Sequence, residues 1–114
     1  MNYDKFIKMS KFKILYITCK NNKEAKQIAK SLVKKKLIAC ANMFPNISSI
    51  YMWKKEIYSS SETVLVAKTI KSKIKNIIQL VKKNHSYECP CIVFADIKNG
   101  NKDFLNWITK SVKS

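Results

Sequence analysis

The chain has 114 residues, which fits one domain and leaves no room for a second. Hydrophobic residues make up 46% of it, but no apolar run approaches the roughly 20 residues that a membrane-spanning helix needs, so we expect no membrane span. The formal net charge is +16, yet all 23 basic residues are lysine, and arginine is the residue whose planar fork reads guanine, so we expect no specific nucleic acid partner.

The first residues are charged and have no apolar core of roughly 7–15 residues, so they do not predict a cleavable secretory signal. We interpret residues 1–11 as a flexible N-terminal extension and residues 12–114 as a single domain.

Apolar residues spaced three and four apart predict one helix over residues 22–36 and a second over 71–84. Runs of β-branched and aromatic residues predict strands at 12–18, 38–44, 47–53, 62–69 and 92–97. Pro45 cannot donate to a sheet ladder, so it marks a bend inside one long ribbon over 38–53. Further predictions are a turn at Lys54 and Lys55, a break at the serine run 59–61, and a closing helix with Phe104, Leu105, Ile108 and Val112 on its apolar face.

The element order β-α-β-β-α-β, followed by a last helix, predicts a ferredoxin-like α+β sandwich. The ribbon over 38–53 is too long and too apolar for the exposed hairpin of a small monomer. An overhanging apolar hairpin is an aggregation hazard unless another copy covers it. The sequence therefore favours a closed oligomer.

The four cysteines do not predict a disulfide framework. Cys89 and Cys91 are two residues apart, which is too close to bridge comfortably, and the chain contains no CxxC pair. We therefore expect free thiols and a reducing compartment. The cytoplasm is the favoured compartment, and an organelle is the alternative. Cys19 is expected in an exposed loop, and Cys40 in a buried strand.

Four pieces of the chain carry a specific pattern. They are Leu37–Asn42 running to Pro45, Ser48–Trp53, Glu62–Thr69 and His85–Pro90. In this order and spacing they resemble the CutA family of divalent-cation tolerance proteins. The resemblance implies a homotrimer in which long hairpins reach around neighbouring subunits, with kinship in fold to PII-type signalling proteins. It also implies metal tolerance and copper binding, without a settled enzymatic reaction.

Two positions depart from the family pattern. Ser86 stands where the family usually has proline, and Cys91 stands where it usually has a glutamate. The second change replaces a hard oxygen donor by a soft thiol, so the preference of a metal site there would move toward copper or zinc.

His85, Cys91 and Cys40 are the predicted metal ligands, with copper or zinc as the possible metal and no cofactor required. His85 is the only histidine, and imidazole is a common metal ligand. The alternatives are structural: His85 hydrogen-bonds a turn, Cys40 packs in the core, and Cys91 packs or points into a site.

Six further residues are candidates for a subunit interface or for a small-ligand cleft between subunits: Tyr51, Trp53, Glu62, Lys68, Tyr87 and Glu88. Tyr51 and Trp53 share one face of a strand and are favoured as interface aromatics. Glu62 and Lys68 share a strand face and are candidates for pairing across subunits. We predict no catalytic residues.

The favoured function is a trimeric CutA-like protein that binds divalent metal or a small ligand and takes part in metal-ion tolerance. The alternative is a basic RNA-binding domain, which shares the element order. That module needs aromatic side chains on its central strands, and the strand at 62–69 has none. An enzyme with Cys19 or Cys40 as nucleophile lacks an activating base in the sequence.

Overall fold

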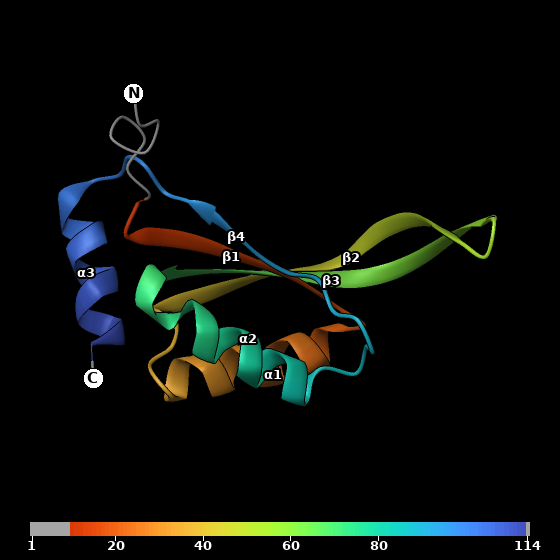
Figure 1. The fold of residues 1–114 in the computed structure, drawn as a ribbon, viewed down its shortest axis with the longest axis horizontal. Coiled ribbons are helices and arrows are strands. Elements are labelled where there is room, and N and C mark those ends of the chain that lie inside the picture. The colour runs from red at the N-terminus through yellow and green to blue at the C-terminus, as the bar shows by residue number, and fades with distance from the viewer. Residues whose placement is uncertain (1–9, 114) are drawn as a thin grey trace, which may run out of the picture.

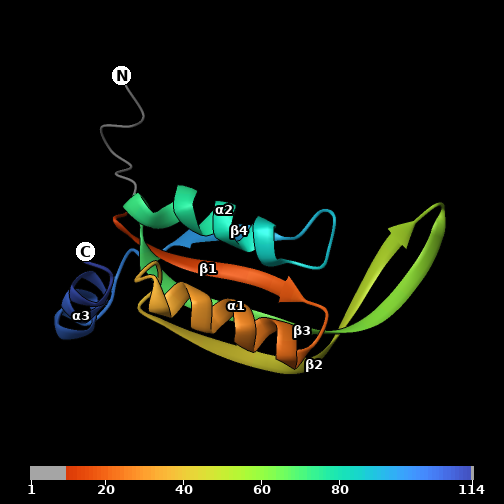
Figure 2. The ribbon, with the colours of Figure 1, turned by 90° about the horizontal axis from the view of Figure 1, so that it is seen from below.

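Two helices cover one face of a four-stranded antiparallel sheet, and a long hairpin extends beyond it (Figures 1 and 2). The computed structural model describes residues 10–113. The strand order is β2-β3-β1-β4. The elements, in chain order, are β1 (Phe12–Cys19), α1 (Asn22–Lys34), β2 (Cys40–Trp53), β3 (Glu56–Ile70), a 3₁₀ turn (Lys71–Lys73), α2 (Ile74–Asn84), β4 (Ile92–Asp96) and α3 (Lys102–Val112). The predicted ferredoxin-like α+β fold with a closing helix is confirmed.

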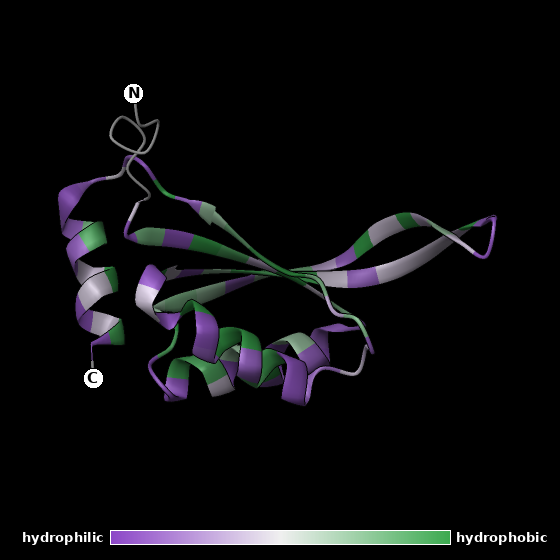
Figure 3. Cartoon of the chain, viewed as in Figure 1, coloured by the Kyte–Doolittle hydropathy of each residue, from purple (hydrophilic) through white to green (hydrophobic). Residues whose placement is uncertain are grey.

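The core lies between the sheet and the two helices. Alternate residues of β1 point toward the helices, and of these Leu15, Ile17 and Cys19 are completely buried. The apolar sides of α1 and α2 face the sheet and their charged sides face away from it (Figure 3). This is the arrangement that the helical periodicity predicts.

Within residues 10–113, no helix layer lies over the opposite face of the sheet (Figure 1). Tyr16, Phe44 and Val93 remain exposed there. Helix α3 packs against the end of the sheet away from the hairpin, where Ile108 and Val112 are buried (Figure 1). One chain therefore leaves a broad apolar sheet surface in contact with solvent.

Strands β2 and β3 form one continuous ladder that reaches the pair Trp53 and Glu56. The register shifts once, between Phe44 and Ile47, where Pro45 and Asn46 form a bulge. Asn46 has φ 58°, a left-handed conformation that asparagine tolerates better than most residues. The bend predicted from the proline is confirmed.

The predicted break at residues 59–61 is wrong. Ser59, Ser60 and Ser61 lie inside β3 and pair with Ile50, Ser49 and Ser48 of β2. Serine favours turns when it stands alone, but here both strands carry small residues at the same level. Backbone pairing therefore continues through the serine run, and the hairpin is a single long arm.

The hairpin ends in a two-residue turn at Lys54 and Lys55, as predicted. Both residues have positive φ, 49° and 67°, as a type I′ turn requires. The apolar side chains near the turn are exposed: Ile50, Tyr51, Met52, Trp53, Ile57 and Tyr58. Ile50 and Ile57 keep 74% and 73% of their surface in solvent, so no described residue of the same chain covers this end of the hairpin.

Helix α1 ends two residues earlier than its apolar pattern predicts. The Leu37 N–H donates to the Leu32 carbonyl and the Lys36 N–H to the Val33 carbonyl, both at 2.9 Å. These two bonds form a Schellman motif, in which the backbone of Lys36 adopts the left-handed conformation, with φ 57°. Glycine is the usual sequence signal for such a helix end. Here three lysines occupy the end of the helix, so the sequence pattern did not predict where the helix stops.

We expect Lys36→Gly to raise the free energy of unfolding by about 0.5–1 kcal/mol, because glycine adopts a positive φ without steric cost. Urea unfolding at fixed protein concentration measures the change. Lys34→Gly is the matched control, since Lys34 is still helical and its replacement should cost about 1 kcal/mol. A Lys36→Gly variant that loses as much stability as the control would contradict the motif.

Polar contacts join the start of β1 to the end of β4. Lys13, only 3% exposed, forms an ion pair with Asp96 of β4, and its hydrogen bond lowers the pKa of that carboxyl group. The Ser10 hydroxyl donates to the Ile97 carbonyl at 2.6 Å.

Residues 1–9 of the expected extension lie outside the described residues. Across residues 10–113, no helix is long and apolar enough to cross a membrane.

Candidate functional site

Three side chains that can bind a metal ion meet where β1 ends. Cys19 is the last residue of β1, Glu24 lies in the first turn of α1, and His85 follows the last residue of α2. Their ligand atoms all lie within 4.8 Å of one another. The Cys19 residue and the His85 side chain have no exposed surface, and Glu24 is 7% exposed. Among residues 10–113, this is the one group of three or more His, Cys, Asp or Glu side chains that lie so close.

Glu24 is positioned by the local structure of the helix N-terminus. The Asn21 side chain accepts a hydrogen bond from the Glu24 N–H at 2.9 Å, which caps α1. The Glu24 carboxylate in turn accepts from the Lys20 N–H and from the Ser86 N–H, each at 3.1 Å. Burial opposes ionisation, but the hydrogen bonds from Ser86 and Lys20 outweigh it and lower the pKa of Glu24. The site therefore holds a carboxylate at neutral pH.

His85 is held by backbone groups at both ring nitrogens. The Tyr87 N–H donates to Nδ1 at 3.0 Å, so this nitrogen carries no proton. Nε2 then carries the proton and lies 2.8 Å from the Thr18 carbonyl, which accepts it. The Glu24 carboxylate stands 3.8 Å from the same nitrogen. The orientation of the imidazole ring is thus fixed by β1 and by its own loop.

Cys19 is a protonated thiol in this environment. Burial is the main cause that raises its pKa to about 12, and the carboxylates of Glu24 and Glu62 add to the increase. Sequence reasoning placed Cys19 in an exposed loop, and that prediction is wrong. Cys19 pairs with Thr63 in the last pair between β1 and β3, and it is completely buried.

A second carboxylate lies beside this cluster. The Tyr87 hydroxyl donates to Glu62 at 2.7 Å, and Glu62 is itself 9% exposed. Burial first, and then the bonded Glu62 carboxylate, raise the pKa of the Tyr87 hydroxyl well above its usual range. Tyr87 thereby links the cluster, through its N–H to His85, with β3.

The charge of this region contrasts with that of the whole chain. Glu24 and Glu62 are two of only seven acidic residues, and both are buried. Neither forms an ion pair with a lysine in the part of the chain that the structure describes. A chain of net charge +16 therefore keeps a local site that is rich in carboxylate and attracts cations.

The three predicted metal ligands do not meet in one chain. His85 belongs to the cluster, but Cys40 pairs with Lys68 of β3, five residues along the strand from Thr63, which pairs with Cys19. Five residues of strand span about 17 Å. Cys91 is exposed just before β4, and within residues 10–113 neither Cys40 nor Cys91 joins a group of three ligating side chains.

The predicted interface and ligand residues fall into separate regions. Tyr51 and Trp53 lie near the hairpin tip, where Tyr51 stacks on Tyr58 with ring centroids 6.1 Å apart. Glu62 and Tyr87 are brought together by their hydrogen bond. The cleft that would unite all of these residues lies between subunits, so it stays a prediction.

Lys68 and Glu88 lie apart from these pairs. The Lys68 ammonium group donates to the Asn42 side chain at 2.6 Å, and Glu88 is exposed in the loop before β4. Lys68 and Glu62 are six residues apart on β3 and form no ion pair within the described chain. Their pairing across subunits stays a prediction.

Glu24 is the functional candidate that sequence reasoning missed. Its signal is the spacing Asn21-x-x-Glu24, which is typical of a helix capping box. Such a pattern predicts a helix start, but it does not reveal that the same carboxylate reaches a histidine 61 residues later, where Glu24 and His85 meet at 3.8 Å.

The fold and this end of the sheet define a ferredoxin-like α+β protein with an extended hairpin and a buried Cys-Glu-His cluster. The family model described as the CutA1 divalent ion tolerance protein matches residues 13–111. The chain therefore belongs to the CutA1 divalent ion tolerance family, and the resemblance found in its four motifs is confirmed.

Relatives in distant organisms support this assignment. The divalent-cation tolerance protein CutA of Archaeoglobus fulgidus is 41% identical over 99 residues, covering 87% of this chain and 96% of the relative. A solved structure from that archaeon, described as a periplasmic divalent cation tolerance protein, has a TM-score of 0.87 at 40% identity and covers 90% of this chain and 99% of its own. CutA1 of Shewanella sp. SIB1 has a TM-score of 0.90 at 31% identity, covering 93% of this chain and 99% of its own.

The animal relatives are longer proteins. Mouse protein CutA is 36% identical over 99 residues, which is 87% of this chain but 56% of the mouse protein. The Xenopus laevis homolog is 40% identical over 93 residues, covering 82% of this chain and 62% of its own length. The chain thus spans a little over half of these relatives.

Proposed function

We propose that this chain is a homotrimeric metal-binding protein of divalent-ion tolerance that holds a metal ion with Cys19, Glu24 and His85. Copper is the first candidate and zinc the second, because a thiolate, an imidazole and a carboxylate form a donor set that both metals accept. The observation that carries the proposal is the close approach of three buried ligand atoms, within 4.8 Å, beside a carboxylate that no lysine neutralises among the described residues.

The ligand atoms need a small movement to close on an ion. Metal bonds of about 2.0–2.3 Å bring ligand atoms to within roughly 4 Å of one another, somewhat closer than they lie here. His85 must also exchange one of its two backbone hydrogen bonds for the metal, either at Nε2 or at Nδ1. We therefore expect metal binding to move the loop after α2, which contains Tyr87.

Calorimetric titration with zinc, and with copper under argon, tests the proposal. We expect one site per chain, with affinity falling about 100-fold or more in His85→Ala and Cys19→Ser, since outer partners of a metal site alone are worth 10–100-fold. Cys89→Ser is the matched control, because it removes an exposed thiol outside the cluster. Mass spectrometry of each sample checks that the thiols are not oxidised.

The same titration tests the ligand set proposed from sequence. If His85 binds metal with Cys91 and Cys40 across subunits, then Cys91→Ser and Cys40→Ser lose affinity while Cys19→Ser does not. That outcome would overturn the cluster proposed here. Equal binding by all four cysteine variants and by His85→Ala would reject both sets.

We propose binding without catalysis. A nucleophilic cysteine needs a lowered pKa or an adjacent base, whereas burial raises the pKa of Cys19 to about 12. His85 does not supply the base, because its unprotonated nitrogen is occupied by the Tyr87 N–H. All four cysteines are free thiols in the described chain, which supports a reducing compartment, the cytoplasm or an organelle with a similar interior.

A further inference from the structure

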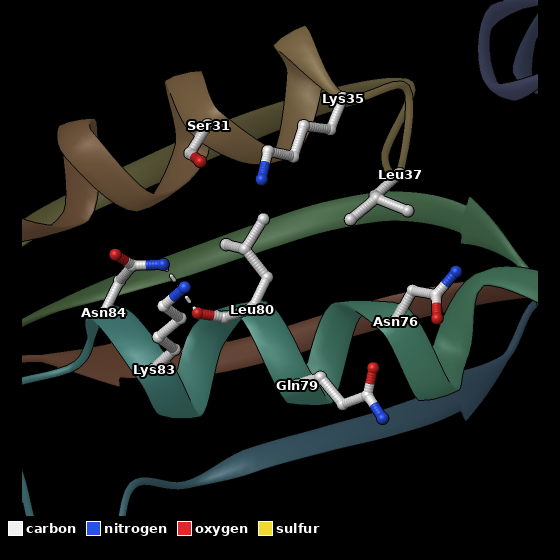
Figure 4. A pocket seen from close by; sticks show the side chains of 8 residues that line it. All are labelled: Ser31, Lys35, Leu37, Asn76, Gln79, Leu80, Lys83 and Asn84. Atoms are coloured by element: carbon white, nitrogen blue, oxygen red, sulfur yellow. Dashed lines mark hydrogen bonds between the residues drawn. The ribbon is translucent and has the colours of Figure 1, made fainter.

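A groove of about 550 Å³ runs between α1 and α2, on the side of the helices that faces away from the sheet (Figure 4). This volume lies within the range of roughly 300–1,000 Å³ that small-molecule sites occupy. The groove shares no residue with the Cys19, Glu24 and His85 cluster or with the hairpin. It is therefore a separate place in the fold.

Two lysines give the groove its charge. Lys35 extends from the end of α1 toward α2, and Lys83 extends from α2 toward α1, so both ammonium groups point into the space between the helices (Figure 4). Across residues 10–113, the one lysine in an ion pair is Lys13. No aspartate or glutamate of the described chain lines the groove. Two positive charges therefore face one cavity without a carboxylate to neutralise them.

The floor of the groove is apolar. Leu80 lies between the two lysines, Leu37 lies near the base of Lys35, and each is 8% exposed (Figure 4). Ser31, Asn76 and Gln79 add hydroxyl and amide groups along the walls. A concave surface of low dielectric constant concentrates the field of nearby charges, which distinguishes these lysines from those spread over convex surfaces.

We propose that this groove binds a small organic phosphate. Its phosphate group lies between Lys35 and Lys83, and its organic part lies over Leu37 and Leu80. Lysine binds phosphate as a point charge, so two ammonium groups on opposite walls suit a small anion of variable orientation. The leucine floor favours a phosphate ester with a ring over inorganic phosphate, because it buries apolar surface.

Equilibrium dialysis at about 0.15 M salt, where exposed charges are screened beyond roughly 8 Å, tests this inference with three probes. They are adenosine monophosphate, inorganic phosphate and adenosine. We expect the nucleotide to bind more tightly than either fragment. The double variant Lys35→Gln/Lys83→Gln should weaken nucleotide binding at least tenfold.

The control is Lys26→Gln/Lys82→Gln, which also removes one exposed lysine near each helix and lowers the net charge equally, from +16 to +14. It should change nucleotide binding less than twofold. Amide NMR shifts on adding the nucleotide should concentrate at Ser31, Lys35 and residues 79–83. Equal losses in both double variants, adenosine binding as tightly as the nucleotide, or no nucleotide binding to the natural chain would each overturn the inference.

Discussion

Tyr51→Glu/Trp53→Glu is expected to convert the proposed trimer into monomers. Light scattering should give about three times 13.2 kDa for the natural chain and 13.2 kDa for the variant. Each large apolar side chain that is fully buried contributes about 1.5–3 kcal/mol, and the hairpin tip exposes six of them in one chain. Two charges placed among them remove two of these contributions and add desolvation costs.

The control for this experiment places the same two charges elsewhere. Gln27→Glu/Ser72→Glu changes two exposed residues, one in α1 and one just before α2, both far from the hairpin in the fold. It should keep the mass of the natural chain. A natural chain that is already monomeric at micromolar concentration would refute the trimer proposal. If Tyr51→Glu/Trp53→Glu is still a trimer, then Tyr51 and Trp53 do not belong to the interface.

The affinity for zinc is expected to rise about tenfold for each pH unit between pH 6 and pH 8, because binding must displace the thiol proton. The pKa of Cys19 is raised to about 12, so the thiol is protonated throughout this range and one proton leaves per bound ion. Glu24 has a lowered pKa and is already ionised, so it adds no proton to this count. Zinc titrations at several pH values, with a competing chelator whose own protonation is known, measure the slope.

Cys19→Ser is the control, since it removes the thiol proton along with the ligand. Its residual affinity should be lower and nearly independent of pH. A natural chain whose zinc affinity does not change between pH 6 and pH 8 would show that the Cys19 sulfur does not bind as a thiolate. In that case the next ligand sets to test would combine His85 with donors other than Cys19.

Local sequence patterns predicted most of the fold because their physical causes are local. The apolar spacing of α1 and α2, the bend at Pro45 and the turn at Lys54 each follow from a few neighbouring residues. The break predicted at the serine run 59–61 was wrong because its cause is not local. Its strand conformation depends on the partner strand β2, which a turn signal within residues 59–61 cannot show.

The candidate site was predicted only in part, because it is made by tertiary contacts. His85 was identified from its rarity and from the family resemblance. Its partners were not, since Cys19 was expected in a loop and the spacing around Glu24 signals only the start of a helix. The sheet order places β1 beside both β3 and β4, and this order brings the end of β1 to the loop that carries His85. No spacing within the sequence contains that information.

The hydrogen bond between His85 and Thr18 joins residues 67 positions apart. Contacts of such sequence separation form late in folding, after the loop entropy of the intervening chain has been overcome. During synthesis, the Cys19 thiol leaves the ribosome long before its histidine partner does. A bound metal ion at this end of the sheet would therefore report that the chain has been made and folded at least as far as His85.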